Sequence, residues 1–507
     1  MEKGLKNEKK NIFLMEIQYF FRHYVNKIII LYSTMKKTFF FALLLVICTL
    51  CANAAKKPAD TKGYRFSFSV KGSSDTIMYL GYYYAGNSYV VDTTKINKKG
   101  QFVFENKDVT LRPGMYFFTN PGGNYVEFAV YHETPNFVFE TKEGSWAQHM
   151  TVKGSKQNEL FYYYHRINRR FYDVIDSASR VKTDEEAFKA FRSSQLRALD
   201  SVKMDIIHSH PDYMIAKMMN ATRDIPVPLQ DSTGRDLSQR ERWEYYMEHY
   251  WDYSPLDDDF LIRTPEAIFH RRFTDYFDKN LRGAAPDIII RYADMTIEKS
   301  RPSKEMFKYI VHTVTEKYLQ SPVMSYDEIY VHLVNKYFAT GDNFWSSPSV
   351  IDEQIKRAAT WEQILIGKTA PNIILKDTLG MIHSLHESNH RYTLLIFWSP
   401  SCGHCKTMIP ELYKKYEQYR DIYDIDAFAV LSEPDDATRP LWKQFIKEHH
   451  LDWKNLDGGE CNIDCHEVYD VITTPQIFLL DKDHKIIAKK LNAETFEKVL
   501  EAYTSNQ

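Results

Sequence analysis

Two cysteines separated by two residues, Cys402 and Cys405, are the side chains of this sequence best suited to do chemistry. They follow the apolar run 394–398, and we expect a helix to begin directly after the first of them. Free N–H groups and the helix dipole favour a thiolate at that position. The spacing also allows a disulfide that stays open to attack on one face. The motif therefore predicts thiol–disulfide exchange, with Cys402 attacking and Cys405 resolving the mixed disulfide.

The same spacing occurs in structural disulfides and in zinc sites, so both are alternatives. A zinc site would need a second pair of ligands. The other pair outside the N-terminal region, Cys461 and Cys465, lies about 60 residues later with a different spacing. A strand before the motif and a helix after it favour the redox interpretation.

The residues around the motif resemble the active-site segment of the thioredoxin superfamily. Trp398 precedes the cysteines, and Pro410 stands where a proline kinks the first helix. A second signature, Thr474-Pro475, follows about 70 residues later. The resemblance implies that this X–Pro bond is cis, which is uncommon, and that its loop packs beside the cysteines. We expect Thr474, Pro475 and Trp398 to bind substrate, with the Thr474 backbone free to pair with an extended chain.

Further upstream, Ala370-Pro371, Asp377 and Gly380 resemble the opening hairpin of the TlpA/ResA-like branch of exported thiol–disulfide oxidoreductases. This resemblance covers residues 363–507 and implies a thioredoxin-like α/β domain. We expect no bound cofactor and no metal. The expected partners are thiols and disulfides of exported proteins and an upstream redox partner that the sequence does not identify.

Two acid–base groups of related proteins are missing. Cytoplasmic thioredoxins carry an aspartate where this chain has Ile396, and several TlpA/ResA-like proteins carry a glutamate where it has Met408. The proton path for Cys405 is therefore unassigned. His404, between the cysteines, gives the Cys-Gly-His-Cys sequence of protein disulfide isomerases. An imidazolium beside a thiolate would stabilise the reduced form and raise the reduction potential; alternatively, His404 is an exposed bystander.

Cys461 and Cys465 would most simply form a small structural disulfide in an oxidising compartment. A second redox pair that exchanges with Cys402 and Cys405, and metal ligation, are the alternatives. A metal site at His383, His386 and His390 is considered but not favoured, because they fall in a hairpin and the turn that follows it.

Residues 35–54 have the pattern of a secretory signal peptide. A lysine pair is followed by the apolar run 39–51, too short to span a bilayer comfortably, and then by an Ala-Asn-Ala cleavage site at 52–54. We interpret residues 1–34 as an over-extended start; an uncleaved membrane anchor is the alternative. The expected location is the periplasm or cell envelope.

Removing residues 1–54 takes away eight Lys/Arg and three Asp/Glu, which changes the net charge from −2 to −7. This mildly acidic chain gives no electrostatic basis for binding nucleic acid or an anionic membrane. No later stretch is apolar enough to be a transmembrane span. The length predicts two or three domains.

Residues 60–153 show short alternating segments separated by turns, which predict a small β-sandwich. Residues 156–357 show helical periodicity, and loops are expected at 226–228 and 346–348, the second as a domain boundary. Thr183 is expected to open one helix with a capping box. Further helices are expected at 243–253, 265–279, 304–319 and 327–337. Both regions resemble uncharacterised domains found joined to TlpA/ResA-like domains.

Two classes of function stay open. One is an envelope thiol–disulfide oxidoreductase whose direction of electron flow depends on its partners. The other is a binding protein that uses its β and helical domains to hold a partner, with the thioredoxin domain as a redox-responsive scaffold. An intact Cys-Gly-His-Cys motif with Thr474-Pro475 favours the first. A peroxiredoxin is disfavoured, since its pattern would need proline at Leu395.

Overall fold

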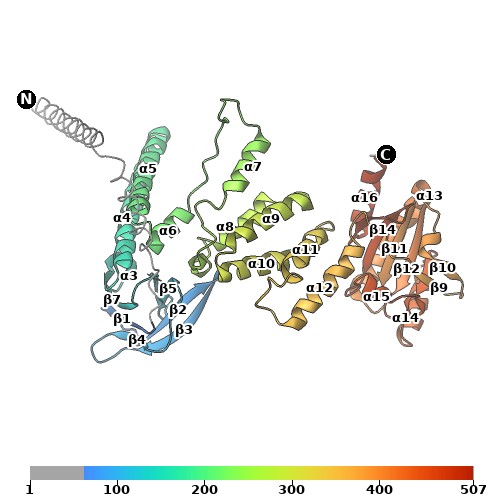
Figure 1. Ribbon diagram of the computed structural model, residues 1–507, viewed down its shortest axis with the longest axis horizontal. Helices are drawn as coiled ribbons and strands as arrows, with labels where there is room; N and C mark the ends of the chain where they lie inside the picture. The colour runs from blue at the N-terminus through green and yellow to red at the C-terminus, as the bar shows by residue number, and fades with distance from the viewer. Residues whose placement is uncertain (1–61, 506–507) are drawn as a thin grey trace, which may run out of the picture.

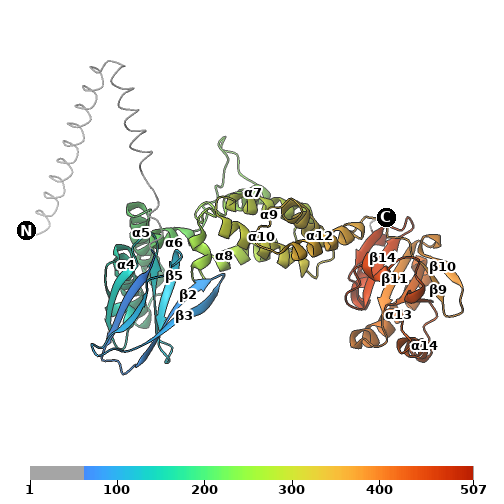
Figure 2. The ribbon, with the colours of Figure 1, turned by 60° about the horizontal axis from the view of Figure 1, so that its bottom comes forward.

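The computed structural model describes residues 62–505, and the predicted signal peptide lies outside them. The chain is arranged as three parts in a row. A β-domain stands at one end, a helical array lies in the middle, and a thioredoxin-like domain forms the other end (Figures 1 and 2). Across residues 62–505, no helix has the length and apolar character needed to cross a membrane.

The predicted β-sandwich is confirmed. Two four-stranded sheets, ordered β4-β1-β7-β8 and β3-β2-β5-β6, enclose a core of buried phenylalanines that includes Phe66, Phe118 and Phe139. Strand alternation explains this core, because every second residue of a strand points to the same face. The strands are β1 (Tyr64–Lys71), β2 (Ile77–Tyr84), β3 (Asn87–Lys95), β4 (Phe102–Asn106), β5 (Gly114–Thr119), β6 (Tyr125–Val130), β7 (Asn136–Lys142) and β8 (Thr151–Lys153), with the short helix α3 (Trp146–His149) before β8.

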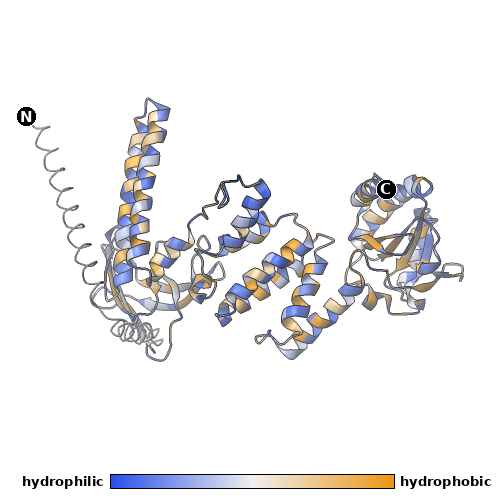
Figure 3. Ribbon diagram, turned by 45° about the horizontal axis from the view of Figure 1, so that its top comes forward, coloured by the Kyte–Doolittle hydropathy of each residue, from blue (hydrophilic) through white to orange (hydrophobic). Residues whose placement is uncertain are grey.

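A pair of long helices, α4 (Lys156–Arg180) and α5 (Glu185–Ser209), projects from the β-domain (Figure 1). Hydrophobic and hydrophilic residues alternate along both (Figure 3). The N-cap of α5 is Asp184, whose carboxylate accepts hydrogen bonds from the N–H groups of Glu186 and Ala187. The expected cap at Thr183 is therefore wrong by one residue, because the aspartate side chain satisfies the first free N–H groups.

The helical array is built around buried aromatic rings, among them Trp251, Tyr292 and Tyr337. Its helices are α6 (Met214–Ala221), α7 (Gln239–His249), α8 (His270–Asp275), α9 (Pro286–Ser300), α10 (Lys304–Leu319), α11 (Asp327–Leu333) and α12 (Pro348–Gln363), with single turns η1 (Asp259–Arg263), η2 (Tyr276–Asn280) and η3 (Val334–Phe338).

The domain boundary expected at 346–348 is wrong. Both expected loops are present, but α12 begins at Pro348 and packs against α11. Pro348 suits the first turn of a helix, where its missing N–H needs no partner. The helix therefore continues the array to Gln363, next to the thioredoxin-like domain.

The C-terminal domain has a seven-stranded sheet ordered β10-β9-β13-β12-β11-β14-β15. The central strand β11 pairs in parallel with β12 and antiparallel with β14, and all of its residues are buried. The strands are β9 (Ile374–Asp377), β10 (Ile382–Ser384), β11 (Tyr392–Trp398), β12 (Ile425–Leu431), β13 (Lys454–Asp457), β14 (Gln476–Asp481) and β15 (Ile486–Lys489). The helices are α13 (Gly403–Tyr423), α14 (Thr438–Glu448), α15 (Cys465–Val468) and α16 (Ala493–Ser505), with turns η4 (Leu385–Glu387) and η5 (Gly458–Glu460).

The two faces of β11 belong to different hydrophobic clusters. Leu394 and Ile396 pack into a cluster formed with α13, α14 and α16. Leu395 and Phe397 belong to a cluster that continues through Trp361 of α12 into the helical array. One face of the thioredoxin-like sheet is thus part of the same core as the helical domain.

Candidate active site

The cysteine motif lies at the carboxyl end of the central strand. β11 ends at Trp398, and α13 begins at Gly403 with Cys402 as its N-cap residue. Both thiols are free; Cys402 is partly exposed and Cys405 is fully buried. The sequence between strand and helix thus places one sulfur at the surface and the other a turn inside.

The two thiols differ in acidity. Burial alone would raise the pKa of Cys402. Hydrogen bonds from the backbone N–H groups of Cys405 and His404 and from the Thr474 side chain outweigh burial and lower it. Burial raises the pKa of Cys405 to about 12. Thiol–disulfide exchange needs a thiolate, so the exposed sulfur is the one prepared to react.

The loop before β14 lies directly beside the cysteines. The Thr474–Pro475 bond is cis, as the resemblance implied, and Cys402 Sγ donates a hydrogen bond to the Thr474 carbonyl oxygen at 3.2 Å. The Thr474 side chain also contributes a hydrogen bond that lowers the pKa of each cysteine. Residues 72 positions apart in the chain therefore form one site.

Trp398 does not lie on the substrate side of this site. Its side chain is completely buried and packs against Phe445 of α14, with 5.2 Å between ring centroids. Because the side chain is buried between the sheet and the helices, it has no exposed surface that a substrate could contact. The expected substrate contact of Trp398 is therefore not supported. The ring holds the end of β11 in place instead.

His404 is exposed on the first turn of α13. Its backbone N–H contributes to the low pKa of Cys402. Within residues 62–505 its imidazole makes no hydrogen bond or ion pair with another side chain. The structure thus shows a hydrogen bond from the His404 backbone, and the role expected of the imidazole stays a prediction.

A carboxylate beside the motif was missed by sequence reasoning. Glu433 Oε2 accepts hydrogen bonds from the hydroxyls of Ser399 at 2.7 Å and Ser401 at 2.8 Å. These two hydroxyls lower the pKa of Glu433. The backbone N–H of Ser399 also donates toward Cys405. Glu433 follows β12, which pairs in parallel with β11, and neighbouring parallel strands end at the same edge of the sheet. The pairing of these two strands was therefore the signal that could have placed Glu433 beside the motif.

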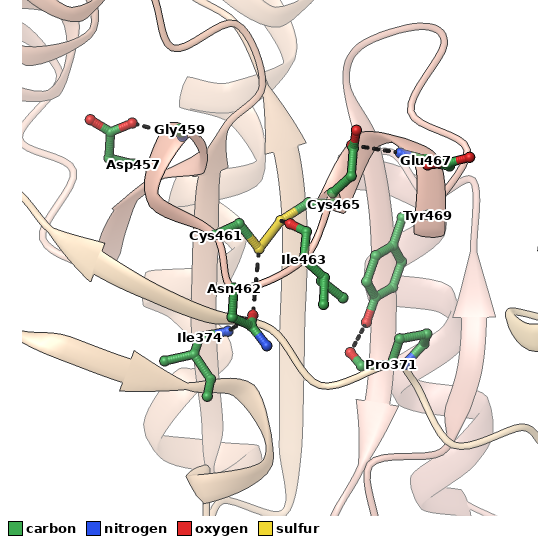
Figure 4. The surroundings of a disulfide bond; sticks show 11 residues. Pro371, Ile374, Asp457, Gly459, Cys461, Asn462, Ile463, Cys465, Glu467 and Tyr469 are labelled. Atoms are coloured by element: carbon green, nitrogen blue, oxygen red, sulfur yellow. Dashed lines mark hydrogen bonds between the residues drawn. A yellow bond between two sulfur atoms is a disulfide. The ribbon is translucent and has the colours of Figure 1, made fainter.

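The second cysteine pair is joined. Cys461 and Cys465 form a disulfide with a Cα–Cα distance of 6.6 Å (Figure 4). Cys465 is the first residue of α15, and Asn462 accepts a hydrogen bond from the Ile374 N–H of β9 at 2.7 Å. The disulfide therefore closes a loop that is tied to β9, the strand next to the edge of the sheet.

The three histidines of the opening hairpin face separate partners. His383 pairs with Asp377 at 2.9 Å, and His390 pairs with Asp424 at 2.7 Å. The ring of His386 lies 2.7 Å from the Ala370 carbonyl oxygen. Among the described residues, no group of three or more His, Cys, Asp or Glu side chains could hold a metal ion.

Three family models match the chain, one in each of its three parts. Residues 366–489 match the model of the AhpC/TSA family. Residues 64–161 and 224–365 match two models described as domains of unknown function, DUF4369 and DUF5106. The fold and the paired cysteines at the end of its central strand define the C-terminal part as a thioredoxin-like oxidoreductase domain.

Two curated relatives are named "Thiol-disulfide oxidoreductase ResA". The one from Bacillus thuringiensis subsp. konkukian is 34% identical over 148 residues, and the one from Bacillus cereus is 33% identical over 147 residues. Each match covers 28% of this chain and 78% of the relative. A crystal structure of a thioredoxin-like protein from Bacteroides caccae is 21% identical, with a TM-score of 0.45, over 55% of this chain and 99% of that chain. The chain belongs, through its C-terminal part, to the ResA family of thiol–disulfide oxidoreductases.

Proposed function

We propose that this oxidoreductase exchanges disulfides with exported proteins in the cell envelope through Cys402 and Cys405. The observation that carries the proposal is the opposite environment of the two sulfurs. One is partly exposed with a lowered pKa, and the other is buried with a raised pKa. A nucleophile and a resolving thiol need that difference.

In the reducing direction, the Cys402 thiolate attacks a substrate disulfide. A bond forms between Cys402 and one substrate sulfur, and the other substrate sulfur leaves as a thiolate. Cys405 then loses its proton and attacks the Cys402 sulfur. The Cys402–Cys405 disulfide forms, and the second substrate thiolate leaves. The same steps in reverse oxidise a dithiol, and the reduction potential of the partner decides the direction.

Thr474 and Pro475 form the substrate edge in this proposal. Proline has no N–H to contribute to a ladder, and the loop already touches Cys402. An extended substrate segment that pairs with the Thr474 backbone would bring its disulfide to the exposed sulfur. We also propose that Glu433 assists deprotonation of Cys405, because it accepts a hydrogen bond from the Ser399 hydroxyl and the Ser399 backbone N–H donates toward Cys405.

The proposal that the protein is exported rests on the signal peptide predicted at residues 35–54. N-terminal sequencing of the protein isolated from cell envelopes should find Ala55 as the first residue. A mature chain that retains residues 35–54 in the cytoplasm would remove this part of the proposal.

Trapping tests the exchange itself. Cys405→Ala should accumulate mixed disulfides with partner proteins through Cys402, and these should disappear on reduction. Cys402→Ala is the matched control and should trap none. Trapping by Cys402→Ala alone would reverse the assignment, and trapping by neither variant would favour the binding-protein alternative.

A further inference from the structure

The helical domain is fixed to the thioredoxin-like domain by a buried charge pair. Asp327, at the start of α11, pairs with Lys489 of β15 at 2.5 Å, and both side chains are less than 5% exposed. Lys490 also reaches Asp327 at 2.8 Å, and Lys489 donates to the Ile364 carbonyl oxygen at 2.9 Å. A buried charge is costly to leave without its partner, so these contacts hold the two domains in one arrangement.

Trp361, near the end of α12, lies in the middle of this junction. Its ring packs against Tyr330 at 4.7 Å between centroids, and the Lys490 ammonium lies 5.6 Å from its centroid. Its indole N–H donates to Asp470 Oδ2 at 2.5 Å. A side chain held by the helical domain therefore binds a residue of the thioredoxin-like domain.

Asp470 is where the loop of the redox site begins. It has a left-handed backbone with φ of 48°, which a non-glycine residue adopts rarely. Its carbonyl oxygen accepts hydrogen bonds from the Ile472 N–H and the Gln476 side-chain amide, each at 2.8 Å. Asp470 thus closes the loop that contains Thr474, the residue in contact with Cys402.

Helix α12 also contacts the segment that precedes Asp470, which begins with α15. Lys356 of α12 pairs with Glu467 of α15 at 2.5 Å. Burial raises the pKa of Asp470, and the charges of Arg357 of α12, Asp327 of α11 and Lys489 of β15 also act on it. The segment from α15 to the loop is therefore positioned from the helical side.

We propose that Trp361 is a positioning residue for the redox site, which acts through its hydrogen bond to Asp470 and so fixes Thr474 against Cys402. The helical domain then contributes to the reactivity of a thiol that it does not touch. This inference rests on the roles proposed above for Cys402 and Thr474.

The test uses the full chain and the rate of Cys402 alkylation by iodoacetamide as a function of pH. Trp361→Phe keeps a ring between Tyr330 and Lys490 but loses the donor. Its alkylation profile should move to higher pH by about half a pKa unit, which makes alkylation about threefold slower below the midpoint. The loosened loop no longer holds the Thr474 side chain as a donor to the thiolate.

Two variants serve as controls. Asp470→Asn keeps an acceptor for the indole and tolerates the left-handed backbone, so its profile should match the wild type. Trp251→Phe loses a comparable indole hydrogen bond, to Thr296 inside the helical domain, and should also match the wild type. If Trp361→Phe fails to fold, Asp470→Gly removes the same hydrogen bond at a position where glycine fits the backbone, and it should show the same displacement.

A folded Trp361→Phe protein with an unchanged profile would overturn the inference. The proposed function would still stand if Cys405→Ala traps partners in that case. A displaced profile without trapping would instead retain the positioning role and remove the proposed exchange with exported proteins.

Discussion

The two cysteine pairs of the C-terminal domain show what context does to the same side chain. Cys402 is the N-cap and Cys405 lies in the first turn of a 21-residue helix at the end of the central strand, and both are free thiols. Cys461 and Cys465 close a loop before a four-residue helix, and they are bonded to each other. The first pair has an exposed sulfur with stabilising donors. The second closes a loop, so we expect the first pair to be reactive and the second to be structural.

The largest effect on activity should come from substituting the first cysteine pair, and substituting the second should have little effect. Cys402→Ser should reduce disulfide reduction of a model substrate to the rate without protein, because no thiolate remains to attack. The double variant Cys461→Ser/Cys465→Ser should keep the wild-type rate within about twofold if its disulfide is structural. A loss of activity in the double variant would show that the second pair takes part in exchange.

Within the first pair, the two thiols should differ strongly in their reaction with iodoacetamide. The pKa of Cys402 is lowered from 9.0 and that of Cys405 is raised to about 12. Each unit changes the thiolate fraction tenfold, so Cys402 should react about 10³-fold faster at about pH 8. Peptide mapping after brief alkylation measures the ratio. Equal labelling would contradict the different environments of the two sulfurs.

Removing the second disulfide should lower stability and leave chemistry intact. Closing a loop of about five residues contributes about 2 kcal/mol through the entropy of the unfolded chain. Denaturant unfolding of Cys461→Ser/Cys465→Ser, followed by tryptophan fluorescence, should show a shift of that size in the transition of the C-terminal domain. An unchanged transition would mean that the hydrogen bond of Asn462 to β9 holds the loop without the disulfide.

A smaller effect on activity should come from changing Glu433, which lies beside the first cysteine pair and not beside the second. Glu433→Gln keeps the size of the side chain and removes the base, so mixed disulfides should be resolved about tenfold more slowly near neutral pH. Single-turnover kinetics can separate this step from the attack by Cys402, which should be unchanged. Glu460→Gln, beside the second pair, is a matched control because it changes a carboxylate that pairs with Lys376. Equal rates for Glu433→Gln and the wild type would remove the carboxylate from the mechanism.

The smallest effect is expected at His404. The residue is exposed, and its ring makes no hydrogen bond to a thiol in the described part of the chain. His404→Pro should lower the reduction potential by at most about 30 mV, which corresponds to about 1.4 kcal/mol. Equilibration with a glutathione redox buffer measures the change. A decrease close to 90 mV would restore the isomerase-like role of the imidazole.

Local signals predicted the parts of the fold that depend on neighbouring residues. The range expected for α10, 304–319, agrees with the structure, because Ser303 caps it and apolar residues follow at helical spacing. The strand and helix around Cys402 were predicted in the same way. Helix α9 was not predicted separately: its N-cap Ala285 makes no side-chain capping bond, and Pro286 in its first turn was a start signal that the sequence analysis did not use.

Contacts between distant segments could not be predicted from spacing. Glu433 reaches Ser399 from another strand, and Trp361 reaches Asp470 across 109 positions. Neither pair shares a periodic pattern. Closeness in sequence can also mislead: Trp398 lies next to the motif in the chain, but its side chain is buried in the core.

The burial of Lys489 bears on how such a protein can be divided. Family models place a border between residues 365 and 366. The partners of Lys489, Asp327 and the Ile364 carbonyl, both lie on the far side of that border. A fragment cut there would carry an ammonium group without its counter-ion and an uncovered apolar sheet face. A fragment of this chain that keeps the Asp327 contacts should therefore extend back at least to Ser321, whose carbonyl oxygen accepts a hydrogen bond from Lys490.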